Sequence, residues 1–285
     1  MKRELVLSII LYNADIDYFL KSLSILNTIK HHHDFIIAVR DNNDGKQIDE
    51  LKNKLRKFDT SFRQNFIFIP STNVGFGKGH NLTFKTIEYD CNYFLIANPD
   101  GVFHCNTIRN LLFKAQETKN RGIYEAIEFP LENKKGYDRT TFETEWCTGS
   151  CLLFPSKIFK EVNGFDEDIF LYCEDVDISW RVRIAGYKCY TVPDAIFTHY
   201  YHSEERESNF IEKESLTSAY KLSIKYAENK FKQYYREKLK TYLSNEEIAS
   251  IAGSIIQYSD EYCKRASRIV RFDKHLLFAK KRIAQ

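Results

Sequence analysis

The sequence lacks several features that would place it in a specialised class of protein. Its net charge is only +3 over 285 residues, because 42 Lys and Arg stand against 39 Asp and Glu. Since a dedicated nucleic-acid-binding protein carries a clear basic excess, we expect no nucleic-acid partner. No stretch approaches about 18 consecutive apolar residues, so we expect no transmembrane helix. Internal repeats and low-complexity linkers are also missing from the sequence.

Signals for export and for a structural metal are missing as well. The N-terminal residues carry two basic side chains and a short apolar run without a small-residue cleavage site, which is more typical of a first strand. Seven cysteines without a leader predict free thiols in a reducing cytoplasm. Cys147 and Cys151 have no second cysteine pair, so a zinc site is not expected. We therefore expect a cytoplasmic protein, at most in contact with the inner face of the cell membrane.

The first hundred residues alternate short apolar runs with amphipathic stretches. Apolar runs predict four buried strands at residues 4–11, 34–40, 65–69 and 92–97. Helical patterns separate them, and such short, wholly apolar strands are typical of a mostly parallel sheet that helices cover on both faces. The predicted fold class is therefore α/β, with a Rossmann-like nucleotide-binding half.

The second half of the chain has a different pattern. We expect a helix, a strand, an irregular charged loop and another strand at residues 106–120, 123–129, 131–145 and 146–154. Further helices are expected at residues 206–227, 229–243, 245–258 and 260–282, and no proline follows Pro193. We therefore divide the chain into an α/β domain of residues 1–204 and a helical extension of residues 205–285. The basic, partly apolar segment 260–285 suits an anionic membrane surface, the α/β domain or a second subunit of a homodimer, and the sequence leaves these alternatives open.

Each of the four predicted strands ends in a polar cluster. The clusters are Asn13, the segment from Asp41 to Asp44, the segment from Asn73 to Gly77, and Asn98 with Asp100. Because ligands of open α/β sheets bind beyond the carboxyl ends of the strands, these clusters predict one shared ligand site.

Two of these clusters suit a phosphorylated ligand. Asp100, after a buried strand, could ligate a divalent cation on a diphosphate, although Asn98-Pro99-Asp100 could equally be a strand-capping turn. The glycine-rich segment 73–81 resembles the phosphate loops between strand and helix, but it lacks the Gly-Lys-Ser/Thr ending and the dinucleotide spacing. A tight turn between strand and helix is the alternative for this segment.

An acidic cluster further along the chain suits proton transfer. Glu174, Asp175 and Asp177 could supply a general base, and their mutual repulsion would raise the pKa of at least one carboxyl group. The alternative is the ordinary preference of acidic residues for the first turn of a helix, with Asp177 and Arg181 as a helix-surface pair. Downstream, His199 could ligate a metal or could simply be packed. The run from His31 to His33 is expected to be a solvated helix end.

Together these segments resemble the family 2 glycosyltransferases, in particular the rhamnosyltransferase-like branch with the GT-A fold. The resemblance covers roughly residues 4–202. It rests on SIILYN, DNND, NVGFGKGHN, ANPD, TGSCLLF and GFDEDIFLYCEDVDISWRVRIAGY, which is followed by His199. It implies transfer of a sugar, with rhamnose as the first candidate, from a dTDP- or UDP-sugar with inversion at the anomeric carbon. The implied acceptor is a glycan or lipid-linked glycan of a surface polysaccharide.

The resemblance also implies roles for individual residues. Nucleotide and donor binding would fall to Tyr12, Asn13, Asp41, Asn43, Gly75, Phe76, Asn81, Asn98 and Asp100. Asp100 and His199 would hold Mg²⁺ or Mn²⁺, with His202 as the alternative histidine, and Asn98 replaces the first Asp of the family's Asp-x-Asp motif. Asp175 would be the catalytic base, supported by Glu174. The acceptor side would be formed by Trp146, Thr148, Gly149 and Arg181.

Two other functions remain open at this stage. A sugar-nucleotidyltransferase would carry a basic glycine-rich loop near the N-terminus, where this chain has Tyr12-Asn13-Ala14-Asp15. A catalytically silent sugar-nucleotide-binding module of the same fold is the second alternative. In a glycosyltransferase, closure of the 131–145 loop could exclude water from the site and so limit hydrolysis of the donor.

Overall fold

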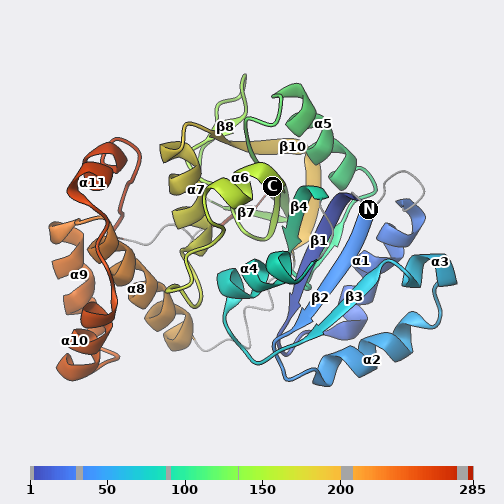
Figure 1. Ribbon diagram of the computed structural model, residues 1–285, viewed down its shortest axis with the longest axis horizontal. Helices are drawn as coiled ribbons and strands as arrows, with labels where there is room; N and C mark the ends of the chain where they lie inside the picture. Colours follow the sequence, from blue (N-terminus) through green and yellow to red (C-terminus); the bar gives the residue numbers. More distant parts are fainter. Residues whose placement is uncertain are drawn as a thin grey trace.

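The computed structural model describes residues 3–29, 35–87, 91–133, 135–199, 208–274 and 282–284. Within these ranges the chain forms a nine-stranded sheet in the order β3-β2-β1-β4-β9-β6-β10-β5, with β8 beside β10 (Figure 1). Its strands are β1 (Arg3–Leu11), β2 (Phe35–Asp41), β3 (Phe66–Pro70), β4 (Cys91–Ala97), β5 (Gly101–Phe103), β6 (Gly122–Phe129), β8 (Glu143–Thr144), β9 (Cys151–Pro155) and β10 (Lys188–His199).

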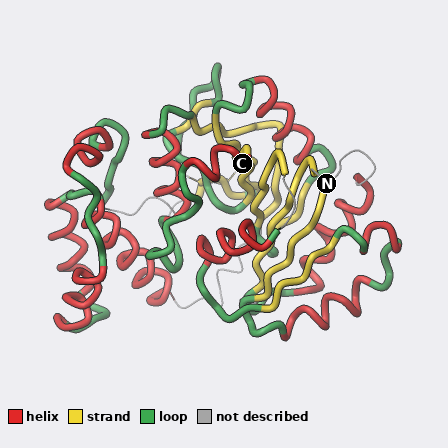
Figure 2. The backbone as a smooth tube through the Cα atoms, viewed as in Figure 1, coloured by secondary structure: helices red, strands yellow, loops and turns green. Residues whose placement is uncertain are grey.

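Helices cover both faces of this sheet (Figure 2). They are α1 (Ile16–Ile29), α2 (Lys46–Leu55), α3 (Thr60–Arg63), α4 (Phe76–Thr86), α5 (Thr107–Glu117), α6 (Ser156–Glu161) and α7 (Glu174–Ile184). The helical extension follows with α8 (Ser208–Lys225), α9 (Asn229–Leu239), α10 (Asn245–Ser254) and α11 (Asp260–Ala266). A separate antiparallel pair joins β7 (Leu131–Asn133) to β11 (Arg282–Ala284).

The N-terminal half of the sheet is parallel, as the sequence predicts. Strands β3, β2, β1 and β4 run in the same direction. Leu7 and Ile9 of β1 pack with Phe19 on one face of the sheet, whereas Val6 packs with Phe159 on the other face. Because both faces of the strand are buried, its central positions are apolar, apart from Ser8, whose hydroxyl group lies 2.8 Å from Nδ1 of the buried His80.

The C-terminal half of the sheet is mixed. Strand β9 runs antiparallel to both of its neighbours, β4 and β6, and β10 runs parallel to β6. The predicted strand at residues 146–154 starts too early, since β9 begins at Cys151. Two backbone N–H groups just before β9 donate to side chains. Glu125 accepts from the Thr148 N–H group, and Asp175 accepts from the Gly149 N–H group. These N–H groups are therefore not available to a sheet ladder, and the segment is a loop.

The helical extension packs on α7 and shares a hydrophobic core with it. Val176 and Trp180 lie in one cluster with Leu216 and Tyr220 of α8. The predicted helix at residues 260–282 is too long, because α11 ends at Ala266 and the following residues turn back onto the protein. Arg271 donates to the carbonyl groups of Ser267, Arg268 and Val270, and so ties this turn together.

The chain after α11 contacts the rest of the protein. The ring of Phe272 lies 5.3 Å from the ring of Trp180. Residues 260–274 therefore pack on the α/β domain. Residues 275–281 lie outside the described residues. In the part of the chain that the structure describes, every helix is too short or too polar to span a bilayer. All seven cysteines are free thiols, as expected.

The predicted irregular loop at residues 131–145 is more ordered than expected. Strand β7 pairs with β11, and β8 pairs with β10. Between them the Lys135 ammonium group is nearly buried on Glu125, at 2.6 Å from its Oε1 atom. The segment is thus fixed at both ends and in the middle.

Candidate active site

Four polar side chains meet where β4, β6 and β10 end. His199 Nε2 lies 3.1 Å from Asp100 Oδ1 and 3.4 Å from Asn98 Nδ2. The other ring nitrogen, Nδ1, lies 3.0 Å from Glu128 Oε1. His199 and Glu128 are almost fully buried, whereas the Asp100 side chain is 33% exposed, so the cluster is open to a ligand on the Asp100 side.

Strand register brings these residues together. Asn98 and Asp100 follow β4 directly, and His199 is the last residue of β10, opposite Gly101 of the short strand β5. A side chain at Gly101 would lie within 2.1 Å of the ring of Phe197, so only glycine allows β5 to approach β10 this closely. The polar ends of β4 and β10, 99 residues apart in the sequence, therefore share one edge.

The electrostatics of this cluster favour a cation. Burial alone would lower the pKa of His199, but the carboxylates of Asp100 and Glu128 outweigh it and raise this pKa to about 9. His199 is therefore expected to be protonated at neutral pH when no other cation is bound. Two adjacent ligands of an octahedral Mg²⁺ at about 2.1 Å would lie about 3 Å apart, close to the observed separation. Glu128 would fix the histidine tautomer, as such carboxylates do in metal sites.

The chain itself supplies few metal ligands here. Among the described residues no group of three or more His, Cys, Asp or Glu side chains is arranged to hold a metal ion. Asp100 and His199 fit two positions of a divalent cation, and the remaining positions would fall to ligand oxygens and water, which is common for Mg²⁺. His202 lies outside the described residues, as do His31 to His33.

Asp175 is held at the start of α7 by two backbone N–H groups. Its Oδ2 accepts from Gly149 at 3.0 Å, and its Oδ1 accepts from Val176 at 2.8 Å. Burial raises the pKa of Asp175, and these two hydrogen bonds oppose that rise. Just before the helix, Tyr172 and Cys173 both adopt positive φ angles, of 66° and 65°. Two successive non-glycine residues in this strained region indicate that the entry to α7 is held in a specific shape.

Glu174, by contrast, points into the protein. Burial and the charge of Asp175 raise the pKa of Glu174 well above its usual value. Its Oε2 atom is buried without a hydrogen-bond partner among the described residues. A neutral carboxyl group is therefore expected beside the Asp175 carboxylate.

A two-residue backbone link joins Asp175 to the His199 cluster. The Asn98 N–H group donates to the Ser150 carbonyl at 2.9 Å. Ser150 follows Gly149, whose N–H group binds Asp175. The cluster of Asn98 and Asp100 and the carboxylate of Asp175 therefore lie on either side of one short turn.

Hydrogen bonds also join the polar segments that follow β1, β2 and β3. Asn43 Nδ2 donates to Asn13 Oδ1 at 3.0 Å, beside the half-exposed ring of Tyr12. Asn42 Nδ2 donates to the Gly75 carbonyl at 3.3 Å. Asp41 is different: it is fully buried, and both its carboxylate oxygens accept backbone N–H groups at the start of α2. Its carboxylate thus organises the turn that leads into α2.

The glycine-rich segment packs on the loop of residues 164–170. A Cβ atom at Gly75 would come within 2.3 Å of the Phe170 carbonyl oxygen, and one at Gly77 within 2.7 Å of Phe165. The Phe76 N–H group donates to the Phe170 carbonyl, and Asn81 Nδ2 donates to the Phe165 carbonyl. These glycines therefore allow close packing between two loops, as the tight-turn alternative expects. Asn81 is buried in the same contact.

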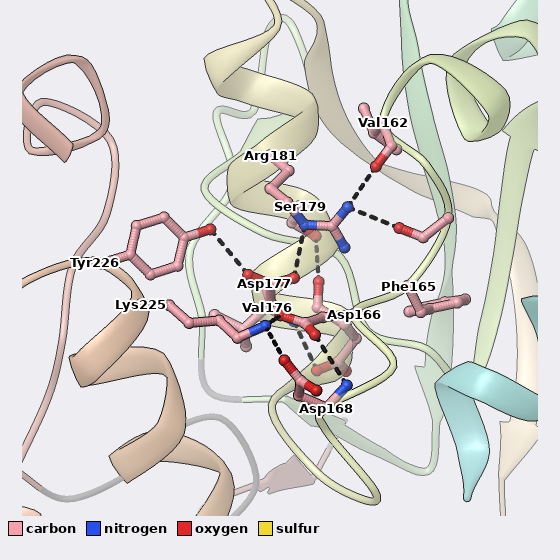
Figure 3. Close-up of polar contacts among 12 residues, drawn as sticks. Val162, Phe165, Asp166, Asp168, Val176, Asp177, Ser179, Arg181, Lys225 and Tyr226 are labelled. Carbon is pink, nitrogen blue, oxygen red and sulfur yellow. Dashed lines mark hydrogen bonds and ion pairs between the residues drawn. The ribbon is translucent and has the colours of Figure 1, made fainter. Parts of the chain in front are cut away.

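Arg181 and Asp177 form the i, i+4 pair of the alternative interpretation, but the pair belongs to a buried network and does not lie on the helix surface (Figure 3). Arg181 Nε lies 2.7 Å from Asp177 Oδ2, and its Nη1 atom donates to the carbonyls of Val162 and Gly164. Tyr226 donates its hydroxyl proton to Asp177 Oδ1 at 2.8 Å. Burial opposes the charge of Arg181, but Asp177 outweighs it and raises the Arg181 pKa. The guanidinium thus holds α7 against the loop of residues 162–164.

Sequence reasoning missed several charged residues around the site. Glu128 and Glu125 are charged positions in a strand that is otherwise apolar, and that contrast is the signal that could have found them. Glu125 binds Lys135 and the Thr148 N–H group beneath the Trp146–Gly149 loop. Burial raises the Glu125 pKa, and Lys135 opposes this. Lys225, which binds Asp166 and Asp168, gave no such signal.

The chain resembles known sugar-transferring proteins in sequence and in fold. No protein-family model matches it. Over 236 residues it is 27% identical to the rhamnosyltransferase WbbL of Escherichia coli, covering 71% of this chain and 86% of that protein. A 63-residue stretch is 44% identical to an N-acetylglucosaminyl-diphospho-decaprenol L-rhamnosyltransferase of Mycobacterium tuberculosis, and covers 22% of this chain and only 20% of that protein.

A solved structure extends the similarity to almost the whole chain. The mannosyltransferase PcManGT of Pyrobaculum calidifontis, in complex with GDP-Man and Mn²⁺, aligns with a TM-score of 0.58 at 13% identity, covering 98% of this chain and 79% of that chain. The fold is therefore that of the GT-A glycosyltransferases. Within that class, the relatives confirm the resemblance to family 2 and to its rhamnosyltransferase-like branch.

Proposed function

We propose that this protein is an inverting glycosyltransferase that moves a sugar from a nucleotide-diphosphosugar to a glycan or lipid-linked glycan. The observation that carries the proposal is the placement of Asp175 and the Asp100–His199 pair on either side of the Gly149–Ser150 turn. One side has the groups for a cation on a diphosphate, and the other has a general base. Relatives that are named as rhamnosyltransferases support rhamnose as the first candidate for the sugar.

Asp100 and His199 are the residues that would bind Mg²⁺ or Mn²⁺ on the donor diphosphate. When bound, the cation would neutralise the charge of the departing nucleoside diphosphate. Asn98 would orient the donor with its amide group, and Glu128 would keep the His199 ring in place. A mannosyltransferase of the same fold that was solved with GDP-Man and Mn²⁺ supports both ligands.

Asp175 would accept the proton of the acceptor hydroxyl as that oxygen attacks the anomeric carbon. A new carbon–oxygen bond forms there, while the bond to the diphosphate oxygen breaks and its electron pair leaves with the nucleoside diphosphate. Attack on the side opposite the leaving group inverts the anomeric configuration. The two N–H groups that hold Asp175 would orient its carboxylate towards the hydroxyl.

The acceptor would meet the loop of residues 146–149, which contacts Asp175 directly. A relative whose name specifies N-acetylglucosaminyl-diphospho-decaprenol supports a lipid-linked sugar as the acceptor class. Building a surface polysaccharide is the process that fits such an acceptor.

Release of nucleoside diphosphate tests the proposal. The protein is incubated with UDP- and dTDP-sugars, including dTDP-rhamnose, and with an N-acetylglucosaminyl diphosphate that carries a short alkyl chain, first with Mn²⁺ and then with chelator. We expect nucleoside diphosphate and a glycosylated acceptor, both reduced by the chelator. Pyrophosphate release would instead favour a nucleotidyltransferase, and no turnover with any donor would favour a silent binding module.

A further inference from the structure

A cavity of about 730 Å³ lies beside the proposed active site. Its walls come from the segments 135–138 and 143–146, from α7, from the start of β10 and from residues 271–273. Asp100, Asp175 and His199 are not among the lining residues. The volume falls within the range of about 300–1,000 Å³ that is typical of ligand pockets. The cavity is therefore large enough for a ligand, and it is separate from the groups that would carry out transfer.

The lining of this cavity suits an uncharged, hydroxyl-rich ligand. Five aromatic side chains line it, together with four basic and four acidic side chains. The charges are balanced, and Lys188 is already paired with Glu143, while Arg183 donates to the backbone carbonyl of Glu145. A nucleoside diphosphate would need a net positive site, which this cavity does not offer. Flat rings with polar groups between them match the alternating C–H faces and hydroxyl edges of sugars.

Contacts connect the cavity to the loop that holds the proposed base. Trp146 lines the cavity and lies under the Lys135 ammonium group, 4.2 Å from the ring centroid. Lys135 binds Glu125, and Glu125 accepts from the Thr148 N–H group at 2.6 Å. The next N–H group along the chain, that of Gly149, binds Asp175. A ligand against Trp146 would thus lie next to the loop where the acceptor hydroxyl must be placed.

We propose that this cavity is a remote acceptor subsite, which binds neutral sugar residues of the acceptor glycan beyond the sugar that receives the transfer. The proposal rests on the proposed function in one respect, namely that the acceptor is a glycan. It predicts that the protein binds an oligosaccharide acceptor more tightly than an acceptor with a single sugar, because the cavity and Asp175 lie at two ends of one loop.

The two tryptophans of the chain give a direct measurement of cavity occupancy. Both Trp146 and Trp180 line the cavity, so tryptophan emission reports on this site. The full chain is titrated with chitotetraose, maltotetraose and a rhamnose tetrasaccharide, without any donor. We expect a saturable change in emission with at least one of them, and we expect it to persist in saturating UDP. The absence of a change with all three glycans, or its loss on addition of UDP, would overturn the proposal.

Variants of two lining tyrosines locate the binding. Tyr137 and Tyr187 are partly exposed and line the cavity, whereas Tyr242 is a partly exposed tyrosine of the helical extension that does not. Tyr137→Ala and Tyr187→Ala should each weaken glycan binding about tenfold, equivalent to about 1.4 kcal/mol, because each removes one ring face. The control Tyr242→Ala should bind as the unmodified protein does. Equal affinity in all three variants, with unchanged melting curves that show folded protein, would contradict the subsite.

This experiment separates the subsite from the enzyme. Glycan binding in the absence of donor needs no catalysis, so binding without transfer to any acceptor would count against the glycosyltransferase alone. Transfer without binding at the cavity would count against the subsite alone. If both hold, Tyr187→Ala should raise the KM for an oligosaccharide acceptor and leave the KM for the donor unchanged.

Discussion

The Tyr226 hydroxyl group donates a hydrogen bond to Asp177 Oδ1 over 2.8 Å, and this contact joins the helical extension to the helix that carries the proposed base. Asp177 Oδ2 is at the same time bound by Arg181, whose guanidinium reaches the carbonyls of Val162 and Gly164. Beside it, Lys225 binds Asp166 and Asp168 (Figure 3). The extension thus holds both α7 and the loop that packs on the glycine-rich segment.

Tyr226→Phe should destabilise the protein by about 1–3 kcal/mol, because it leaves a buried carboxylate oxygen without its donor. The matched control is Tyr234→Phe, since the Tyr234 hydroxyl donates to an exposed carbonyl, that of Lys274. Urea unfolding of the two variants measures the difference. Equal unfolding midpoints would show that the contact of Tyr226 with Asp177 does not support the fold.

Gly75→Ala should lower the melting temperature and weaken donor binding. The new Cβ atom would lie within 2.3 Å of the Phe170 carbonyl oxygen, and the φ angle of +87° disfavours any side chain. Gly136→Ala is the control, because a Cβ atom there would meet nothing within 4 Å. Thermal melting and a donor-binding titration compare the two. If Gly75→Ala behaves like Gly136→Ala, the close packing between the two loops is not required.

Glu128→Gln should weaken Mn²⁺ binding about 10- to 100-fold, which is the usual cost of changing a carboxylate behind a metal-bound histidine. The substitution keeps the shape of the side chain but removes the charge that faces His199 Nδ1. Glu143→Gln, on strand β8 on the other side of β10, is a control carboxylate that pairs with Lys188 away from the cluster. Calorimetric titration with Mn²⁺ gives the affinities. Equal affinities for both variants would remove Glu128 from the metal site.

Transfer should slow at acidic pH. Burial raises the pKa of Asp175 above its usual value of 3.8, and the protonated carboxyl group cannot accept a proton from the acceptor. Activity should therefore be complete above this raised pKa and fall as the pH drops through it. The pH profile of kcat/KM measures this limb, and the residual activity of Asp175→Asn should lack it. A profile that is the same in both proteins would assign the limb to another group.

The sheet could be predicted from the sequence because strands that are buried on both faces are apolar at nearly every position. Leu7 and Val6 of β1 face opposite sides and are both fully buried, so the run is apolar on both faces except at Ser8, which is paired with His80. The ends of these strands can also be read from the sequence, since a polar cluster follows each apolar run. The meeting of Asp100 with His199 required the family resemblance, because no local pattern connects positions 99 residues apart.

The features that the sequence did not predict depend on tertiary contacts. Strand β9 starts at Cys151 because Glu125 and Asp175 take backbone N–H groups of the preceding loop. Arg181 looked like a surface residue, since a helical i, i+4 spacing does not show that the helical extension covers that face. Lys225 lies near the end of a charged helix, and nothing in the sequence indicates that it forms ion pairs with Asp166 and Asp168.

The central claim is that Asp175 is the base of a sugar transfer whose donor is held elsewhere in the site. Single-turnover transfer by Asp175→Asn, together with a donor-binding titration, tests it most directly, with Asp49→Asn on the exposed face of α2 as the control. We predict that transfer falls about 10²- to 10⁴-fold, the usual contribution of a general base, while donor affinity is unchanged. Near-normal transfer by Asp175→Asn would contradict the account.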